Sequence, residues 1–196
     1  MSKNLYIIAG CNGAGKTTAS FTILPEILDC REFVNADEIA RGLSPFQPEN
    51  VAIEAGRVML GRIENLLNEN CNFAFETTLA TRSYRNTILR AQAAGYNVTL
   101  LFFWLRTVEL AKERVQIRVA EGGHNIDTAT IERRYMSGIR NLFEIYLPVA
   151  DAVLILDNSK VEPELIAEKS DNSTVTIINE QKYNDLLKYY DTERKN

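Results

Sequence analysis

The sequence is poor in the residues that build disulfide frameworks and metal centres. It contains three cysteines and one histidine, and no two cysteines stand in a C-x-x-C spacing. An odd number of widely separated cysteines excludes a disulfide scaffold and indicates no zinc site. We therefore expect a protein with reduced thiols.

Long hydrophobic runs and an excess of positive charge are also missing. No apolar run approaches the roughly 20 residues that cross a bilayer. The run that follows Lys3, "LYIIA", is too short for a signal peptide. The net charge of −4 argues against general nucleic-acid binding. These absences predict a cytoplasmic protein that binds neither membranes nor nucleic acid.

What remains is the composition of an ordinary globular protein. Hydrophobic residues make up 45% of the chain and charged residues 24%. A length of 196 residues suits one domain, because most domains contain roughly 100–150 residues and α/β domains run larger. We expect residues 1–196 to form a single domain.

Strand-like apolar runs alternate with helical patterns along most of the chain. This alternation predicts an α/β protein with a mostly parallel, five-stranded sheet and helices on both faces. The run 97–105 is too continuously apolar for a half-exposed strand, so it should lie in the centre of the sheet. The expected strands are 5–9, 32–36, 72–76, 97–105 and 151–156, and the expected helices are 15–24, 50–69, 83–94, 108–120 and 130–146.

Three segments depart from this alternation. Residues 41–49 contain two prolines and predict a loop. Residues 121–130 contain paired glycines between two arginine-bearing helices, which predicts a hinged lid. Residues 158–196 form an expected C-terminal extension with an edge strand over 173–178 and an amphipathic helix through Tyr183, Leu186, Leu187 and Tyr190.

The stretch "GCNGAGKTT" lies between the first expected strand and the first expected helix, and it has the G-x-x-x-x-G-K-T spacing of a phosphate-binding loop. In this motif backbone N–H groups and the start of a helix face phosphate oxygens. The lysine reaches the β- and γ-phosphates, and the following threonine ligates Mg²⁺. We therefore predict a nucleotide site, with Thr17 as the metal ligand, built from Gly10, Asn12, Gly13, Ala14, Gly15, Lys16, Thr17 and Thr18.

Asp37 follows the second expected strand in "VNADEIA". Ligands of such sheets bind at the carboxyl ends of the strands, so this residue should lie near the phosphate loop. A carboxylate there can take the proton of an attacking hydroxyl, or it can hold Mg²⁺ through water. It can equally cap the helix that follows, and the spacing favours neither role.

The third expected strand ends in "FAFETTLAT", which places an acid and two hydroxyls at the same edge of the sheet. Glu76 and Thr78 can orient a polar substrate there. The same residues are also good helix caps, so the pattern again leaves both roles open.

Residues 82–140 carry nine arginines and one lysine against five acidic residues. Arg114 and Arg118 lie four apart on one expected helix and therefore share a face, and Arg133 and Arg134 follow the expected lid. Arginines brought in by a closing lid would neutralise the charge on a transferred phosphoryl group. The alternative is a set of surface arginines paired with neighbouring glutamates.

The phosphate loop, "NADEIA", "FETTL" and "RVAEGGH…IERRY" occur in this order, and together they resemble the zeta-toxin family of P-loop kinases, in particular its small stand-alone bacterial branch. The resemblance covers about residues 4 to 158. Members of that family use ATP and Mg²⁺ to phosphorylate the 3′-hydroxyl of the sugar in UDP-N-acetylglucosamine. The resemblance implies the same activity here and makes an antitoxin protein a candidate partner.

Residue roles follow from the same resemblance. It makes Lys16 and Thr17 the Walker residues, Asp37 the general base, and Arg118 and Arg134 the catalytic lid arginines. It also makes Glu76 and Thr78 substrate contacts. In the family the third-strand motif is usually Glu-Gly-Thr-Leu followed by Arg, whereas this chain has Glu-Thr-Thr-Leu-Ala, and the nearest arginine for that contact is Arg82.

Two other functions fit the motifs. One is a kinase for a different small molecule, and the other is a nucleotide-dependent switch or regulatory ATPase. No N-K-x-D guanine signature is present, which weakens a GTPase switch. Fold class does not separate these functions, because P-loop sheets carry all of them.

Overall fold

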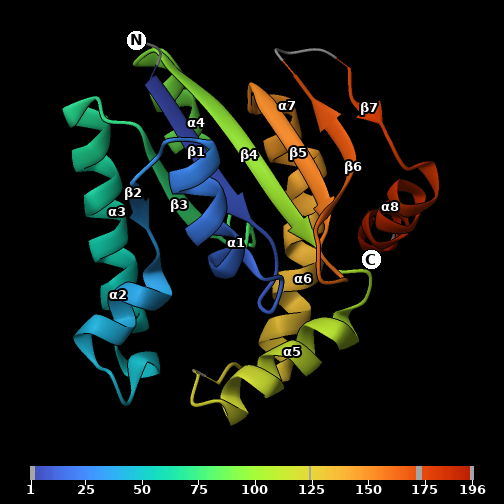
Figure 1. Cartoon of the computed structure of the whole chain (residues 1–196), viewed down its shortest axis with the longest axis horizontal. Helices are drawn as coiled ribbons and strands as arrows, with labels where there is room; N and C mark the ends of the chain where they lie inside the picture. Colours follow the sequence, from blue (N-terminus) through green and yellow to red (C-terminus); the bar gives the residue numbers. More distant parts are fainter. Residues whose placement is uncertain (1–2, 124, 171–173, 195–196) are drawn as a thin grey trace.

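A single seven-stranded sheet organises the protein (Figure 1). The computed structural model describes residues 3–123, 125–170 and 174–194. The strand order is β2-β3-β1-β4-β5-β6-β7. The first five strands in this order run parallel, β6 pairs antiparallel with β5, and β7 pairs antiparallel with β6. The strands are β1 (Lys3–Ala9), β2 (Glu32–Val34), β3 (Phe73–Thr77), β4 (Tyr96–Trp104), β5 (Ala152–Asp157), β6 (Glu164–Lys169) and β7 (Thr176–Ile177).

Helices lie on both faces of this sheet, as the alternation predicted. In Figure 1, α1 crosses the front of the sheet, whereas α4 and α6 lie behind it. Among the described residues, no helix is both long and apolar enough to cross a membrane. The helical elements are α1 (Lys16–Thr22), η1 (Ile23–Ile27), α2 (Ala36–Leu43), η2 (Pro48–Val51), α3 (Ala52–Glu69), α4 (Tyr84–Ala93), α5 (Val108–Ala120), α6 (Thr128–Asn141), η3 (Leu142–Tyr146), α7 (Leu147–Val149) and α8 (Glu180–Arg194).

The prediction of five strands was wrong, because the sheet has seven. All five expected parallel strands are present. The strand missed entirely is β6, whose sequence "ELIAEK" mixes three apolar residues with charges and pairs antiparallel with β5. The expected C-terminal edge strand is confirmed as the short β7, and the expected helix as α8, which buries Tyr183 and Leu186.

The loop predicted over 41–49 begins later than expected, because Arg41, Gly42 and Leu43 belong to α2. Pro45 lies two residues past the end of this helix, and proline both lacks a backbone N–H and restricts the residue before it. The segment is therefore helical up to Leu43, irregular over 44–47, and helical again from Pro48, where η2 begins.

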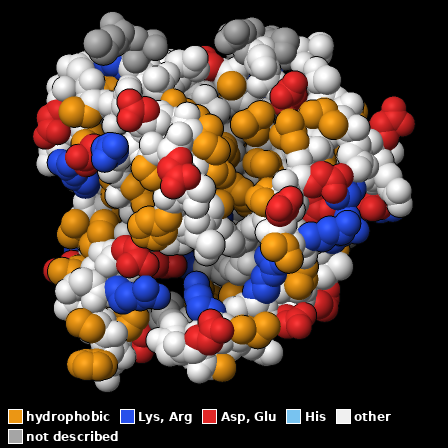
Figure 2. Space-filling view, viewed as in Figure 1, with side chains coloured by type: hydrophobic (Ala, Val, Ile, Leu, Met, Phe, Trp, Pro, Cys, Tyr) orange, Lys and Arg blue, Asp and Glu red, His pale blue; other side chains and the backbone are white. Residues whose placement is uncertain are grey.

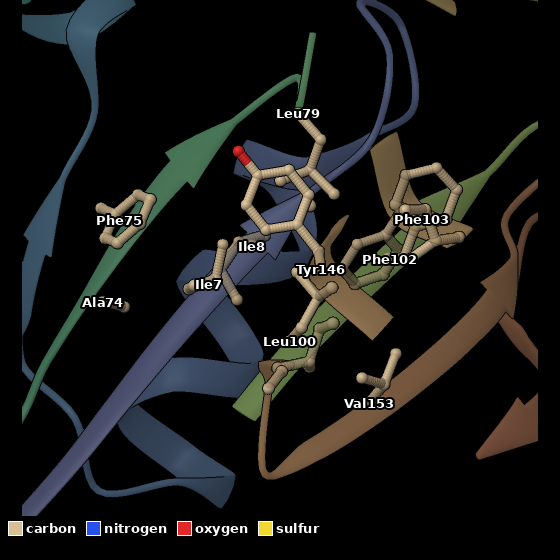
Figure 3. Close-up of a cluster of buried hydrophobic side chains, with 14 of the residues drawn as sticks. Ile7, Ile8, Ala74, Phe75, Leu79, Leu100, Phe102, Phe103, Tyr146 and Val153 are labelled. Carbon is tan, nitrogen blue, oxygen red and sulfur yellow. The ribbon is translucent and has the colours of Figure 1, made fainter. Parts of the chain in front are cut away.

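The centre of the sheet is β4, which pairs with β1 on one side and β5 on the other. Five consecutive residues at its end, Leu100 to Trp104, are buried. This confirms the expected central strand. Figure 3 shows side chains of β1, β3, β4 and β5 gathered into this core, with Tyr146 of η3 among them.

Strand register brings the functional segments to one edge. Ala9, the last residue of β1, pairs with Thr77 on one side and Phe102 on the other, and Val34 of β2 pairs with Phe75. The carboxyl ends of β2, β3 and β1 therefore lie side by side. The segments that start at Gly10 and Asn35 and the end of β3 meet there.

The C-terminal extension is fastened to the sheet through Asp157, whose carboxylate is buried at the end of β5. It accepts hydrogen bonds from Arg106 Nε at 2.9 Å and from the backbone N–H of Ser159 at 3.0 Å, and it forms an ion pair at 2.9 Å with Lys182 Nζ of α8. Burial alone would raise the pKa of Asp157, but the hydrogen bonds from Ser159, Lys182 and Arg106 outweigh it and lower the pKa to about 2.

Gly10 provides a test of the tight packing at the end of β1. Its φ is +145°, and an added Cβ would lie 2.3 Å from the carbonyl oxygen of Phe103. We expect Gly10→Ala to lower the free energy of unfolding by about 2–3 kcal/mol, the scale of backbone strain plus overpacking. Gly42→Ala on α2 is the control, because no heavy atom lies within 4 Å of its added Cβ. Equal urea-unfolding midpoints for the two variants would contradict the packing argument.

Asp157 predicts a dependence of stability on pH. Its folded-state pKa of about 2 lies below the ordinary value of 3.8, so its contribution is complete above pH ~4 and is lost as the pH falls toward ~2. We expect Asp157→Asn to cost on the order of 2 kcal/mol at pH 7 and progressively less below pH 4. Asp185→Asn, in an exposed ion pair with Lys188, is the control in urea titrations from pH 7 to 3. A wild-type advantage over Asp157→Asn that stays constant down to pH 3 would refute this role of the carboxylate.

Candidate active site

The phosphate-binding loop joins β1 to α1, and its glycines are needed for its shape. Gly10, Gly13 and Gly15 have φ values of 145°, 81° and 77°, which side chains rarely adopt. Added Cβ atoms at Gly13 and Gly15 would lie 2.7 Å from the carbonyl oxygen of Ala111 and 2.6 Å from Asn158 Nδ2. The loop is therefore pressed against α5 and the end of β5, which holds its backbone in one conformation.

Lys16 lies buried in this loop with its charge directed across it. Its Nζ donates a hydrogen bond at 3.0 Å to the carbonyl oxygen of Cys11 and lies 3.4 Å from Glu76 Oε1. Burial raises the pKa of the Cys11 thiol to about 11, so this cysteine is neutral at physiological pH. The charged side chain that Lys16 contacts is Glu76.

Glu76 connects three segments at the edge of the sheet. Its Oε2 accepts hydrogen bonds from Thr17 Oγ1 at 2.7 Å and from Asn35 Nδ2 at 2.9 Å. The cap interpretation of this motif was wrong, because the next helix, α4, begins only at Tyr84. Thr77 Oγ1 instead accepts a hydrogen bond from the N–H of Leu79 in the turn after β3. Glu76 thus faces the phosphate loop, whereas Thr78 lines a neighbouring cavity.

Asp37 does not cap α2. The cap is Asn35, whose Oδ1 accepts hydrogen bonds from the backbone N–H groups of Asp37 and Glu38 at 2.8 and 3.4 Å. The cap interpretation of Asp37 was therefore wrong, because the helix begins one residue before it. Its carboxylate is left to face the cavities of the site.

Two cavities meet at Asp37. The larger has a volume of about 540 Å³ and the smaller about 220 Å³, and both are lined by Ala36, Asp37 and Arg134. Figure 2 shows acidic and basic side chains around a hollow below the strand ends, between α2 and α5. The larger cavity is also lined by Thr17, Thr18, Phe21, Glu38, Ala40, Arg41, Pro48, Ala52 and Arg118, and the smaller by Asn12, Lys16, Asn35, Met59, Glu76, Thr77, Thr78, Thr81 and Tyr84.

Arg134 and Arg118 both reach this site. Arg134, on α6, donates a hydrogen bond at 3.1 Å from Nη1 to Asn12 Oδ1 of the phosphate loop. Burial lowers the pKa of Arg134, and Asp37 opposes that effect. A guanidinium stays protonated under such conditions, so Arg134 brings a positive charge to the junction of the cavities. Arg118, on α5, lines the larger cavity.

Four other basic residues of 82–140 are bound to protein groups. Arg114 donates hydrogen bonds at 2.9 and 3.1 Å to the carbonyl oxygens of Asn158 and Ser159. Ion pairs join Arg90, Lys112 and Arg106 to Glu64, Glu132 and Asp157. Arg133 and Arg82 are exposed, and neither is among the residues that line the two cavities. Of the basic residues of 82–140, Arg118 and Arg134 line the two cavities and the others do not.

The paired glycines of the expected lid end helix α5. Gly122 has a φ of 87°, its N–H donates to the carbonyl of Val119, and the N–H of Gly123 donates to the carbonyl of Arg118 at 2.8 Å. This is the hydrogen-bond pattern of a Schellman cap. The cap fixes the turn that follows the last helical turn of α5, which carries Arg118 of the larger cavity. His124, within the same expected lid, lies outside the described residues.

Sequence reasoning missed several residues of the site. Asn35 caps α2 and contacts Glu76, Arg41 and Tyr84 line the cavities, and Asn158 donates to the carbonyl of Ala14 at 2.7 Å. The signal for Asn35 was available, since asparagine directly before "ADEIA" is a favoured cap. Asn158 carries no such signal, because it lies 144 residues from its partner.

Known proteins share both the sequence pattern and the fold. A protein of Haemophilus influenzae (strain ATCC 51907 / DSM 11121 / KW20 / Rd), described as uncharacterized, is 30% identical over 137 residues, which cover 69% of this chain and 94% of that protein. The AvrRxo1-ORF1:AvrRxo1-ORF2 complex determined with ATP matches with a TM-score of 0.73 at 15% identity, over 94% of this chain. The present chain spans 63% of that one.

A structure from the PezAT chromosomal toxin-antitoxin system of Streptococcus pneumoniae matches with a TM-score of 0.64 at 16% identity, covering all of this chain and 88% of the other. These likenesses show the shared fold of P-loop kinases. The sequence profile of the family described as Zeta toxin matches residues 1–181. This confirms the resemblance that the four motifs indicated, and the chain belongs to the zeta toxin family.

Proposed function

We propose that this protein is an ATP-dependent phosphotransferase that phosphorylates a hydroxyl group of a small nucleotide-sugar such as UDP-N-acetylglucosamine. One observation carries the proposal. Asp37, free of any capping duty, lies where two cavities meet beside the phosphate loop, and Arg134 lines both cavities with it. A base and a cation at one junction suit transfer of a phosphoryl group between two bound molecules.

ATP would bind with its phosphates along the loop from Gly10 to Thr18, with Lys16 at the β- and γ-phosphates. Family membership supports this nucleotide, as does the fold shared with a complex determined with ATP. Lys16 would exchange its present contact with Glu76 for the phosphate oxygens. Glu76 then stays beside Thr17 and Asn35.

The residues around Thr17 also fit Mg²⁺. Mg²⁺ prefers hard oxygen ligands and commonly takes one or two protein groups plus phosphates and water. The Thr17 hydroxyl and the Glu76 carboxylate, 2.7 Å apart, provide such oxygens. Within the described ranges no group of three or more His, Cys, Asp or Glu side chains forms a metal site by itself, which agrees with an ion that arrives with ATP. When bound, Mg²⁺ neutralises charge on the β- and γ-phosphates.

Asp37 would accept the proton of the acceptor hydroxyl as its oxygen forms a bond to the γ-phosphorus. The bond between that phosphorus and the bridging oxygen of ATP breaks, and ADP leaves with the electron pair. Arg134, held at the loop by Asn12, would offset the charge on the transferred group, and Arg118 would add a second guanidinium from α5. Residues 121–130, which join the helices that carry Arg118 and Arg134, would act as the lid over the site.

The acceptor would occupy the cavities that Asp37 lines, on the side away from the phosphate loop. Thr78, Thr81 and Tyr84 offer hydroxyl groups in the smaller cavity, which suits a sugar. Arg41 adds a third guanidinium to the larger cavity, which suits an acceptor that carries its own phosphates. Arg41, Arg118 and Arg134 all line the larger cavity and would make this contact, with Arg41 exchanging its 3.2 Å ion pair with Glu38 for the acceptor.

Compartment and partner belong to the same proposal. Free thiols on all three cysteines agree with a reducing cytoplasm. An antitoxin protein is a proposed partner, and the support is family membership together with the toxin-antitoxin origin of one structural neighbour.

The acceptor is tested by mixing protein, ATP, Mg²⁺ and UDP-N-acetylglucosamine. We expect mass spectrometry to detect a phosphorylated sugar-nucleotide, and the Lys16→Ala protein, purified in the same way, to form none. Phosphate on a different metabolite from a pool would retain the kinase and replace the acceptor. ATP consumption that is equal with and without metabolites would favour a regulatory ATPase instead.

Asp37→Asn tests the general base. We expect transfer to fall by ~10²-fold or more, because proton removal is lost, while the ATP dissociation constant changes little. Glu54→Gln, an exposed carboxylate on α3, is the control. Undiminished transfer by Asp37→Asn in single-turnover assays would remove Asp37 from the chemistry.

A further inference from the structure

The segment that follows β5 packs against the phosphate loop through Asn158. Asn158 is 8% exposed, and its Nδ2 donates a hydrogen bond at 2.7 Å to the carbonyl oxygen of Ala14. The same nitrogen lies 2.6 Å from the position that a Cβ on Gly15 would take. Asn158 is therefore in contact with the loop where helix α1 begins.

This contact fixes the direction of a backbone donor. In a trans peptide the C=O and the following N–H point in opposite directions. Holding the Ala14 carbonyl toward Asn158 therefore aims the Gly15 N–H away from it. In loops of this kind such N–H groups bind phosphate oxygens.

Asn158 is itself held rigidly from two sides. Arg114 donates from its two terminal nitrogens to the carbonyl oxygens of Asn158 and Ser159. The backbone N–H of Asn158 donates to the carbonyl of Trp104 at 2.8 Å. The side chain of Asn158 thus has little freedom to leave the Ala14 carbonyl.

The neighbouring Asp157 ties this segment to the C-terminal helix. Lys182 of α8 lies 2.9 Å from Asp157 Oδ2, and Lys182 also pairs with Glu164 on β6. Further along α8, Tyr189 Oη donates at 2.9 Å to the carbonyl of Arg106. A continuous chain of contacts therefore leads from α8 through Asp157 and Asn158 to the phosphate loop.

We propose that Asn158 is a positioning residue for phosphate binding, and that α8 sets the affinity for ATP through the Lys182–Asp157 pair. The inference rests on ATP being the ligand of the loop. It assigns a function to the C-terminal extension. The extension lines neither cavity of the site, but Asn158 holds the Ala14 carbonyl of the phosphate loop. The acceptor side of the site is independent of this chain of contacts.

Calorimetric titration of the full-length protein with ATP and Mg²⁺ tests the proposal. We expect Asn158→Ala to weaken ATP binding about tenfold, the scale on which loss of one buried hydrogen bond acts on affinity. Lys182→Met should weaken it severalfold, and Lys182→Arg should restore most of the loss because the charge is kept. Lys188→Met is the matched control on the same helix, since Lys188 is exposed and forms an ion pair with Asp185.

The outcomes separate the two proposals. Failure of the wild-type protein to bind ATP would refute the proposed function. Wild-type binding with unchanged affinity in Asn158→Ala and Lys182→Met, even with lower melting temperatures, would overturn the positioning role alone. If Asn158→Ala does not fold, the Lys182→Met and Lys182→Arg pair decides: equal affinities in both would refute the link to α8.

Discussion

The carboxylate of Glu76 is the point on which the geometry of this site depends. It stands at the end of β3, between the ends of β1 and β2, and contacts the lysine and threonine of the phosphate loop together with Asn35. A carboxylate that is mostly removed from water, as that of Glu76 is, is costly unless it is paired and hydrogen-bonded, and these partners supply both. One side chain thereby fixes the start of α1 relative to the start of α2.

That arrangement in turn leaves Asp37 free. Asn35 supplies the cap of α2 and also donates to Glu76, so the carboxylate of Asp37 is not needed to cap the helix. It projects where the two cavities meet. The helix cap and the cavity-lining carboxylate are thus separated within three consecutive residues.

A similar division runs through the arginines. Arg106 and Arg114 brace the segment after β5, whereas Arg118, one helical turn beyond Arg114, reaches the larger cavity. Helix α6 carries Arg134 to the loop at one point and, further along, Asn141 donates to the carbonyl of Leu79 at 2.7 Å. Leu79 has a φ of 55°, and it appears in Figure 3 among the buried side chains. The same helix therefore positions an arginine and supports the turn that follows β3.

The sequence alone determined the local features of this protein. The glycine and lysine spacing identified the phosphate loop, apolar continuity identified β4 as the central strand, and the helix expected over 108–120 is α5. Four motifs in order were enough to identify the family. These signals are local because each depends on residues within one turn, one strand or one loop.

Only the tertiary structure decided which polar residues share a site. Whether Asp37 caps a helix depended on a competing asparagine two residues earlier, and whether an arginine is structural depended on acids and carbonyls far along the chain. Asn158 meets Ala14 because β5 and β1 flank β4 in one parallel sheet. Strand β6 was missed because its three apolar residues, flanked by charged ones, show no strand periodicity and form a strand by pairing with β5. Periodicity reports which face of an element is buried, but long-range pairing in the sheet decides what lies opposite it.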